Sequence, residues 1–184
     1  MESRRFRQKV AFMDKENAEL KSLTDKGLVV SGNALSSVIL LKGKLNDQDL
    51  SSEGLLSGRD GDALRASLVA LKYQPQDWLA ISTLDSNNNS INPLLLRQAI
   101  SVASPTTVII CDEEACEVFR NTFAEELASL PEILEAMLAP GQLAHILGMR
   151  VINLGGFEAS LDDMAQKQTV WSYLKKVPCT NQPY

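Results

Sequence analysis

The sequence predicts a three-layer α/β/α fold around a central, mostly parallel sheet of four strands. Four short runs rich in β-branched residues alternate with stretches whose apolar residues recur at helical spacing, and this alternation is typical of βαβ units. The chain has 184 residues, which is enough for one domain with a substantial core. Polar loops separate the runs without interrupting them, so each run is expected to be one element.

The four predicted strands are nearly continuous apolar stretches bounded by polar or turn-forming residues. They cover residues 37–41, 78–82, 107–111 and 150–154. A strand that is apolar on both faces is expected inside a parallel sheet with helices on each side. The strands therefore predict a sheet that is covered on both faces.

A helix is expected before the first strand and after each of the four. Asn92 is a favourable N-cap for one of them, and Pro93 is a favourable first helical residue. The expected helices are 5–24, from residue 60 or 61 through 71, from 93 to a stop at Pro105, from about 113 to Pro131, 132–138, and 161–176.

Charge and composition suggest one domain with uneven electrostatics. We expect a mildly basic helix within residues 1–26, a single domain at 27–178 and a tail at 179–184. The net charge is −5, yet residues 112–135 alone hold eight acids against Arg120. We interpret this segment as a solvated helical face, with a partner-binding surface as the alternative. A loosely docked N-terminal helix is favoured over a nucleic-acid-binding arm.

The chain shows no pattern of export or membrane insertion. Its start lacks the apolar run of a signal peptide, and no stretch reaches the roughly 18 uncharged apolar residues of a membrane span. An odd count of three cysteines favours free thiols in a reducing cytoplasm. The acidic balance argues against broad nonspecific nucleic-acid binding but leaves a local basic groove open.

The ligand site is expected where the strands end, because open parallel sheets bind ligands outside their carboxyl ends. Segments 43–61, 83–91, 111–114 and 155–160 meet there. The first is a loop of nearly twenty residues, a length that usually has a function. Its glycines Gly54, Gly58 and Gly61 could let backbone N–H groups approach an anion, or could form a plain turn capped by Asp60.

Several side chains near these strand ends are of types that can bind ligands or carry out chemistry. Arg59 could contact phosphate or pair with a nearby acid. Residues 112–114, Asp-Glu-Glu, could supply a base but more simply favour the positive end of a helix dipole. Cys111 and Cys116 are too few for a zinc site, since only His145 and Cys179 could complete it. No metal or cofactor is expected, and His145 is expected to be a partly buried structural residue.

Taken together, residues 30–177 resemble the uracil-DNA glycosylase superfamily, specifically its bacterial thermostable type. The family's apolar strand and first glycine are matched by 38–42 and Gly43, and its next glycine, eleven residues later, by Gly54. The family's Gly-Arg-containing motif is similar to residues 58–64, and its closing Lys-x-x-x-Trp-x-x-Leu pattern to 167–174. The resemblance implies a glycosylase-like α/β fold.

The departures from the family pattern fall at its catalytic positions. Lys44 stands where the family has an acid, Asn46 where it has proline, and Thr83 where an asparagine reads the base edge. The stacking aromatic is replaced around Leu55, and the catalytic histidine corresponds to Gly156. The iron–sulfur cysteines are absent. Base excision needs a pocket that stacks and hydrogen-bonds the flipped base, and a donor for the departing anion.

The resemblance therefore implies a glycosylase-like protein that has lost uracil excision and serves as a nucleic-acid-binding, nucleotide-binding or regulatory module. Two alternatives stay open: an enzyme acting on another base or nucleotide through Lys44 and Asp60, and a protein-interaction domain using the acidic 112–135 face. A basic crevice holding Lys42, Lys44 and Arg59 would favour nucleic acid, and an acidic one would disfavour it. The residues expected to line the crevice are Gly43, Lys44, Asn46, Asp47, Gly58, Arg59, Asp60, Gly61 and Thr83.

Overall fold

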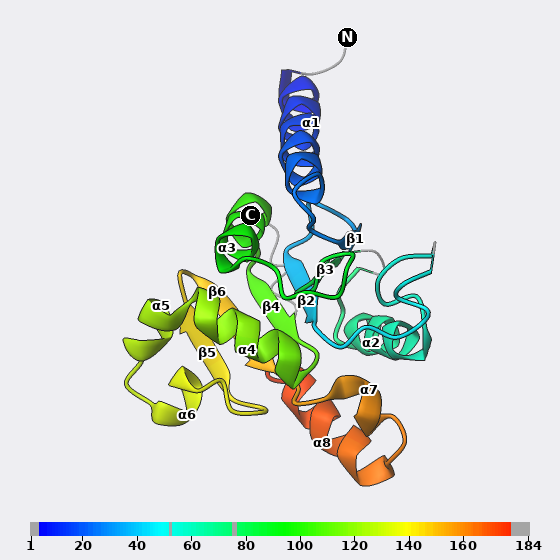
Figure 1. Cartoon of the computed structure of the whole chain (residues 1–184), viewed down its shortest axis with the longest axis vertical. Helices are drawn as coiled ribbons and strands as arrows, with labels where there is room; N and C mark the ends of the chain where they lie inside the picture. The colour runs from blue at the N-terminus through cyan, green and yellow to red at the C-terminus, as the bar shows by residue number, and fades with distance from the viewer. Residues whose placement is uncertain (1–3, 52, 75–76, 178–184) are drawn as a thin grey trace.

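A six-stranded mixed sheet forms the centre of the protein (Figure 1). The computed structural model describes residues 4–51, 53–74 and 77–177, so the expected tail at 179–184, with Cys179, lies outside the described residues. The strand order is β1-β3-β2-β4-β6-β5. The strands are β1 (Val30–Gly32), β2 (Val38–Lys42), β3 (Leu79–Ser82), β4 (Thr107–Ile110), β5 (Leu143–Ile146) and β6 (Met149–Asn153).

The α/β class is confirmed, but the expected count of four strands is wrong. The four predicted strands are present as β2, β3, β4 and β6, and their neighbouring pairs are parallel. Two further strands, β1 and β5, pair antiparallel at the two edges. These edge strands are short and only partly buried, so they lack the continuous apolar run by which the central strands were found.

The turn between β5 and β6 explains why this hairpin was missed. Ile146 pairs with Met149, so Leu147 and Gly148 form a two-residue loop, and both have positive φ, at 48° and 79°. Such loops normally begin with Asn, Asp or Gly, because leucine rarely adopts the left-handed region. His145 lies on β5 and is exposed, which contradicts the expected partly buried histidine.

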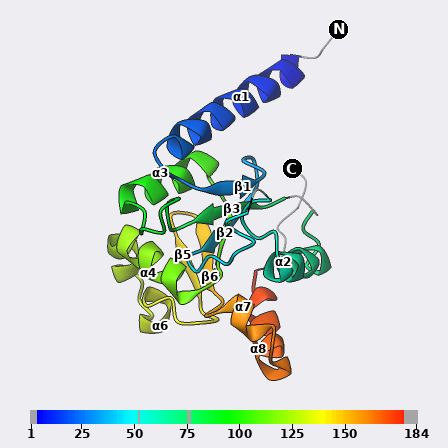
Figure 2. The same ribbon diagram turned by 45° about the vertical axis from the view of Figure 1, so that its right-hand side comes forward.

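Helices cover both faces of the sheet (Figure 2). One core cluster joins one face to α1, α3, α4 and α5, and the other joins the opposite face to α2, α7 and α8. The described helices are α1 (Arg4–Thr24), α2 (Arg59–Ala70), α3 (Pro93–Ala103), α4 (Glu113–Thr122), α5 (Ala124–Ala128), α6 (Ile133–Ala136), α7 (Phe157–Ser160) and α8 (Met164–Leu174).

Two expected helices have different bounds in the structure. The helix expected from about 113 to Pro131 breaks at Phe123 into α4 and α5. The helix expected over 161–176 is shorter, because Asp163 caps a separate α8 by accepting from the Gln166 N–H. The short helix α7 precedes α8 and lies in the segment that follows β6, at the carboxyl end of that strand.

The N-terminal helix packs on the body only through its last turns. Leu20 and Leu23 are buried against the α3 side of the core, while the rest of α1 projects away from the sheet (Figure 2). No helix in the described part of the chain has the length and apolarity needed to cross a membrane.

Candidate functional site

A crevice of about 390 Å³ opens beyond the carboxyl ends of β2, β4 and β6. Three loops and the first turn of α2 form its walls, which is where ligands bind in open parallel sheets. Its lining consists of Lys42 at the end of β2, Lys44, Leu45 and Asn46 after it, Asp60 on α2, 111–114 after β4, and 155–159 with Asp162 after β6.

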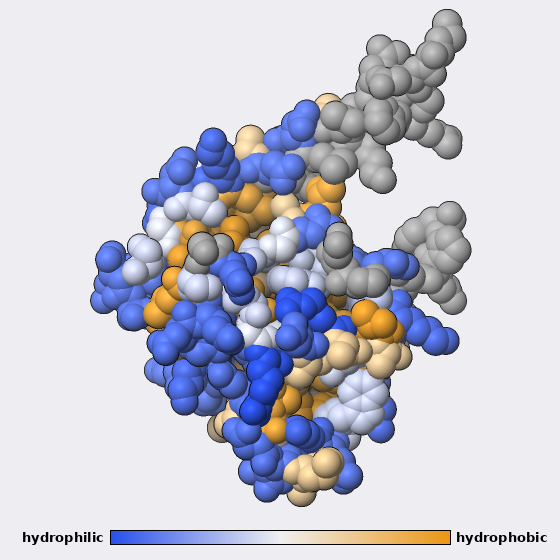
Figure 3. All heavy atoms as spheres, turned by 90° about the vertical axis from the view of Figure 1, so that its right-hand side faces the viewer, coloured by the Kyte–Doolittle hydropathy of each residue, from blue (hydrophilic) through white to orange (hydrophobic). Residues whose placement is uncertain are grey.

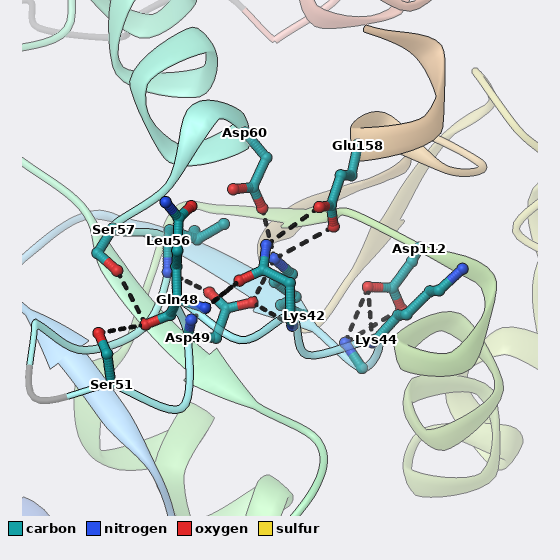
Figure 4. Close-up of polar contacts among 12 residues, drawn as sticks. Lys42, Lys44, Gln48, Asp49, Ser51, Leu56, Ser57, Asp60, Asp112 and Glu158 are labelled. Carbon is teal, nitrogen blue, oxygen red and sulfur yellow. Dashed lines mark hydrogen bonds and ion pairs between the residues drawn. The ribbon is translucent and has the colours of Figure 1, made fainter. Parts of the chain in front are cut away.

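A fully buried lysine forms the floor of the crevice. Lys42 is the last residue of β2, and its side chain is only 2% exposed. Its Nζ atom lies 2.5 Å from Oδ2 of Asp49 and 2.5 Å from Oδ2 of Asp60, and 3.5 Å from Oε2 of Glu158 (Figure 4). Burial alone lowers the pKa of Lys42, but the hydrogen bonds and charges of Asp49 and Asp60 outweigh it and raise the pKa. Lys42 is therefore an ammonium group whose donors are directed at carboxylates.

The loop after β2 is built around Asp49. Its Oδ2 atom accepts from the Asn46 N–H at 2.9 Å, and its Oδ1 atom accepts from the Leu56 N–H at 2.8 Å. The Asn46 side chain accepts in turn from the N–H groups of Gln48 and Asp49. Asp49 thus closes the loop on itself and supplies a counter-charge to Lys42, which explains how a polar loop can sit over a buried lysine.

Asp60 brings α2 to the same lysine. It is 2% exposed, and its Oδ1 atom has no hydrogen-bond partner among the described residues. A cap by Asp60 was one of the two interpretations of this loop, and it is wrong: Gly58 is the N-cap of α2 and no side chain bonds there. The carboxylate is instead held by Lys42.

Asp112 joins the end of β2 to the start of α4. Its carboxylate accepts from the backbone N–H groups of Gly43, Lys44 and Ala115 at distances of 2.8–3.1 Å. Burial raises the pKa of Asp112, these hydrogen bonds oppose the increase, and the charge of Glu114 adds to it. Asp112 is the N-cap of α4, and its carboxylate binds backbone N–H groups.

The crevice is acidic. Six carboxylates and two ammonium groups line it, a formal excess of four negative charges. Arg59 neutralises Asp162, and Arg120 neutralises Glu113, but the buried Asp49 adds another carboxylate. An excess of negative charge remains, and the basic crevice that would favour nucleic acid is not found.

Only some of the residues expected at this site line the crevice. Lys44, Asn46 and Asp60 line the crevice, and so does Gly156, the position of the family's histidine. Gly43 is buried beneath the start of α4, and Asp47 is exposed on the loop.

Thr83 lies outside the crevice lining. It is fully buried, and its hydroxyl donates to the Lys42 carbonyl oxygen at 3.5 Å. The side chain of Lys44 extends past Asp112, away from Asp60 (Figure 4).

The glycine loop is a packing feature. A Cβ atom on Gly61 would lie 1.7 Å from the Leu56 carbonyl oxygen, so this position needs a glycine for close approach. Gly54 has a φ of +89°, which also favours glycine. The first turn of α2 carries Asp60 and Asp62, which oppose an anion at the helix N-terminus. The loop fits a plain turn without the Asp60 cap, and Arg59 pairs with the nearby acid Asp162 at 2.5 Å.

Cys111 and Cys116 belong to no metal-binding cluster in the described part of the chain. Cys111 and Cys116 are buried free thiols. Among the described residues, no group of three or more histidine, cysteine or acidic side chains is arranged to hold a metal ion.

Four site residues were missed by reasoning from sequence: Asp49, Asp112 as a structural ligand, Glu158 and Asp162. Lys42 ends an apolar run, and a charge at such a position requires a buried partner of opposite charge. This was the signal in the sequence for an acid such as Asp49. Glu158 and Asp162 had no such signal, since they lie more than 100 residues from Lys42. No protein-family model matches this sequence, and no curated protein is significantly similar to it.

Proposed function

We propose that this chain is a glycosylase-like protein without uracil excision that works as a binding or regulatory module. The observation that carries the proposal is the state of Lys42: the cation at the crevice floor is held by Asp49 and Asp60. The four parallel strands and the crevice at their ends support the glycosylase-like part of the proposal.

Loss of excision follows from the charges around the position where a base would sit. A departing uracil anion needs a preorganised hydrogen-bond donor or positive charge. Gly156 offers only its backbone, and no atom lies within 4 Å of the Cβ position that a side chain would occupy. The ammonium group of Lys42 already contacts three carboxylates. Glu114 and Glu158 add negative charge to the walls of the crevice. This environment would destabilise the anion.

The same charges define the ligand that the crevice accepts. Phosphate groups would be repelled by the excess of carboxylates, so a nucleic-acid strand or a nucleotide phosphate is disfavoured here. A small ligand with an ammonium or guanidinium group would relieve the excess. The module is therefore proposed to bind a small cationic molecule in place of DNA.

The binding experiment compares agmatine, which carries a guanidinium group, with uridine 5′-monophosphate. Titration of the isotope-labelled chain, followed by amide NMR, should shift the resonances of Gly155 and Gly156 with agmatine and leave them unchanged with the nucleotide. Glu114→Gln should weaken agmatine binding, whereas Glu117→Gln, on the same helix but outside the crevice, should not. Tighter binding of the nucleotide would overturn the assignment of ligand charge.

Loss of excision is tested separately with uracil-containing DNA under single-turnover conditions. No uracil release is expected from the wild-type chain. Release that is abolished by Lys44→Met would contradict the proposal and restore the alternative of an active enzyme. That alternative requires Lys44 and Asp60 to act together in the crevice. Their side chains point apart (Figure 4), and Asp60 forms an ion pair with Lys42.

A protein-interaction role is the second candidate, and one observation favours it. Ile133, Leu134 and Met137 are 53–71% exposed around α6, and Glu132 and Glu135 lie among them. An exposed apolar surface with an acidic rim suits a basic amphipathic helix. Fluorescence anisotropy with a labelled Lys/Leu helical peptide tests this role; binding should weaken in Leu134→Ser and stay unchanged in Val69→Ser, a matched exposed position on α2.

A further inference from the structure

A second hollow, distinct from the crevice, lies between α2 and α8. Helix α7 packs against both of these helices, and the gap that remains between α2 and α8 is a groove of about 570 Å³. This volume is within the range of small-molecule sites. On the side of the protein formed by α2, α7 and α8, apolar surface is exposed among hydrophilic side chains (Figure 3).

The walls of the groove are mainly apolar. Ala63 and Ala66 come from α2, and Val170, Trp171 and Leu174 come from α8. Trp171 is half-buried, so part of its ring is available to pack on a flat molecule. Aromatic rings gain stability from such packing beyond the area that they bury. The walls therefore suit a flat apolar body.

The charged groups of the groove are both cations. Arg59 and Lys167 line it, and its described lining contains no carboxylate, although the chain as a whole has a net charge of −5. The lining hydroxyls of Ser67 and Ser160 already donate to the backbone carbonyls of Ala63 and Phe157. The charged donors left for a ligand are therefore Arg59 and Lys167, beside the uncharged indole N–H of Trp171.

Arg59 and Lys167 lie near the same carboxylate. Arg59 bonds Asp162, and the charges of Arg59 and then Lys167 contribute to lowering the pKa of that carboxyl. Asp162 itself lines the acidic crevice, so the Arg59–Asp162 pair separates two sites of opposite charge. Both side chains of this pair are more than 60% exposed, so solvent screens their attraction and the pair contributes little to stability. A ligand anion could replace Asp162 at little cost.

We propose that this groove binds a small aromatic carboxylate, with its ring against Trp171 and its carboxylate between Arg59 and Lys167. The proposal rests on the apolar walls, the volume and the paired cations, and it is independent of the function proposed for the acidic crevice. The ring supplies buried area, and the two cations select the anion over neutral molecules of the same shape.

The test uses 2-naphthoate with two probes of matched shape, 2-naphthalenemethanol and 2-naphthylmethylammonium. NMR titration of the full chain should show saturable binding of naphthoate at the indole N–H of Trp171 and none at Trp78. The neutral alcohol should bind about five- to ten-fold more weakly, and the cation more weakly still. Equal binding of the alcohol would overturn the anion assignment, and a lack of saturable naphthoate binding would overturn the site.

Matched variants locate the binding. Lys167→Glu should weaken naphthoate binding about five- to ten-fold, whereas Lys175→Glu, the same charge change just beyond α8 and outside the groove, should leave it within about two-fold. Ala66→Trp, at an exposed position of α2, should fill the groove and abolish binding. Equal effects of the two lysine variants would contradict the proposal even if Ala66→Trp failed to fold.

Two other occupants are outcomes of the same experiments. If sedimentation shows a dimer that Ala66→Trp dissociates, the groove is an interface with a second copy and the proposal fails. If Ala66→Trp shifts the resonances of Tyr184 before ligand is added, residues of the chain's own end occupy the groove, and the proposal fails likewise.

Discussion

The Nζ atom of Lys42 lies 2.5 Å from the Oδ2 atom of Asp60, and both side chains are buried where β2 meets the start of α2. A buried ion pair contributes little net stability, because desolvation of both charges offsets their attraction. Removal of one partner is different, since it leaves the other charge buried without compensation. The pair therefore fixes how α2 and the loop after β2 join the sheet.

Lys42→Met should lower the free energy of unfolding by about 3–5 kcal/mol, because Asp49 and Asp60 would then be buried without a counter-charge. Urea denaturation measures this loss. Lys44→Met, at the exposed lysine two residues later, should change stability by about 0.5 kcal/mol or less. In Lys42→Met/Asp60→Asn the loss should be smaller than the sum of the single losses. Additive losses would show that Lys42 and Asp60 are not energetically coupled.

The central sheet could be predicted because its signal is local. Each of β2, β3 and β4 is buried at every position, so a continuous apolar run marks it. The edge strands could not be predicted in this way. Half of β5 faces solvent or is partly exposed, and the turn that pairs it with β6 places Leu147 at a φ of 48°, where a leucine gives no turn signal.

The candidate site was predicted in position but not in chemistry. The carboxyl ends of the strands fix where loops converge, so Lys44, Asn46 and Asp60 were expected at the crevice. Ion pairing depends on tertiary contacts that sequence spacing does not reveal. Glu158 reaches Lys42 across 116 positions of the chain, and Arg59 reaches Asp162 across 103. Lys42 and Arg59, two of the three residues that suggested a basic crevice, are consequently neutralised by acids.

Gly61→Ala should be strongly destabilising, whereas Gly58→Ala should be mild. A Cβ atom at Gly61 would lie 1.7 Å from the Leu56 backbone oxygen, which can move only with the loop. At Gly58 the nearest obstacle is the Gln48 side-chain oxygen at 1.9 Å, and that flexible side chain can rotate away. We expect a loss of about 2 kcal/mol or more for Gly61→Ala in urea denaturation. A loss at Gly61 as small as that at Gly58 would show that the loop adjusts to the added Cβ atom.

The ion pair between Arg97 on α3 and Glu126 on α5 should make a small, pH-dependent contribution to stability. The hydrogen bonds from Arg97 lower the pKa of Glu126 below its ordinary value of 4.5. A lowered carboxyl pKa gives stability that is complete above pH 4.5 and is lost as the pH falls through the folded-state pKa. Arg97 is 41% exposed, so solvent screens the pair and we expect its contribution to be small.

The measurement is the gap in unfolding free energy between wild type and Glu126→Gln as a function of pH. The gap should be constant near neutral pH and shrink below pH 4.5. Glu125→Gln, at a neighbouring acid without an ion pair among the described residues, should show no such change. A gap that widened on acidification would have the wrong sign for a lowered pKa.

Cys111 and Cys116 should not react as thiolates in the folded protein. Burial raises the pKa of Cys111 well above its ordinary value, with the charge of Asp112 adding to the effect, and burial raises the pKa of Cys116 to about 12. Since the thiolate is the nucleophile, a disulfide reagent at pH 8 should label neither residue before unfolding. In a Cys179→Ser background the folded chain should release no chromophore, and the chain in urea should release two equivalents.

Labelling of one equivalent in the folded chain would contradict this expectation, and Cys111→Ser would identify the reactive residue. The distinction bears on the crevice, because Cys111 is one of its lining residues. A reactive Cys111 would supply a nucleophile beside Asp112 and would favour an enzyme. An unreactive thiol leaves the crevice with carboxylates, a neutralised Lys42 and an outward Lys44, a set of groups that can hold a cationic ligand but has no activated nucleophile.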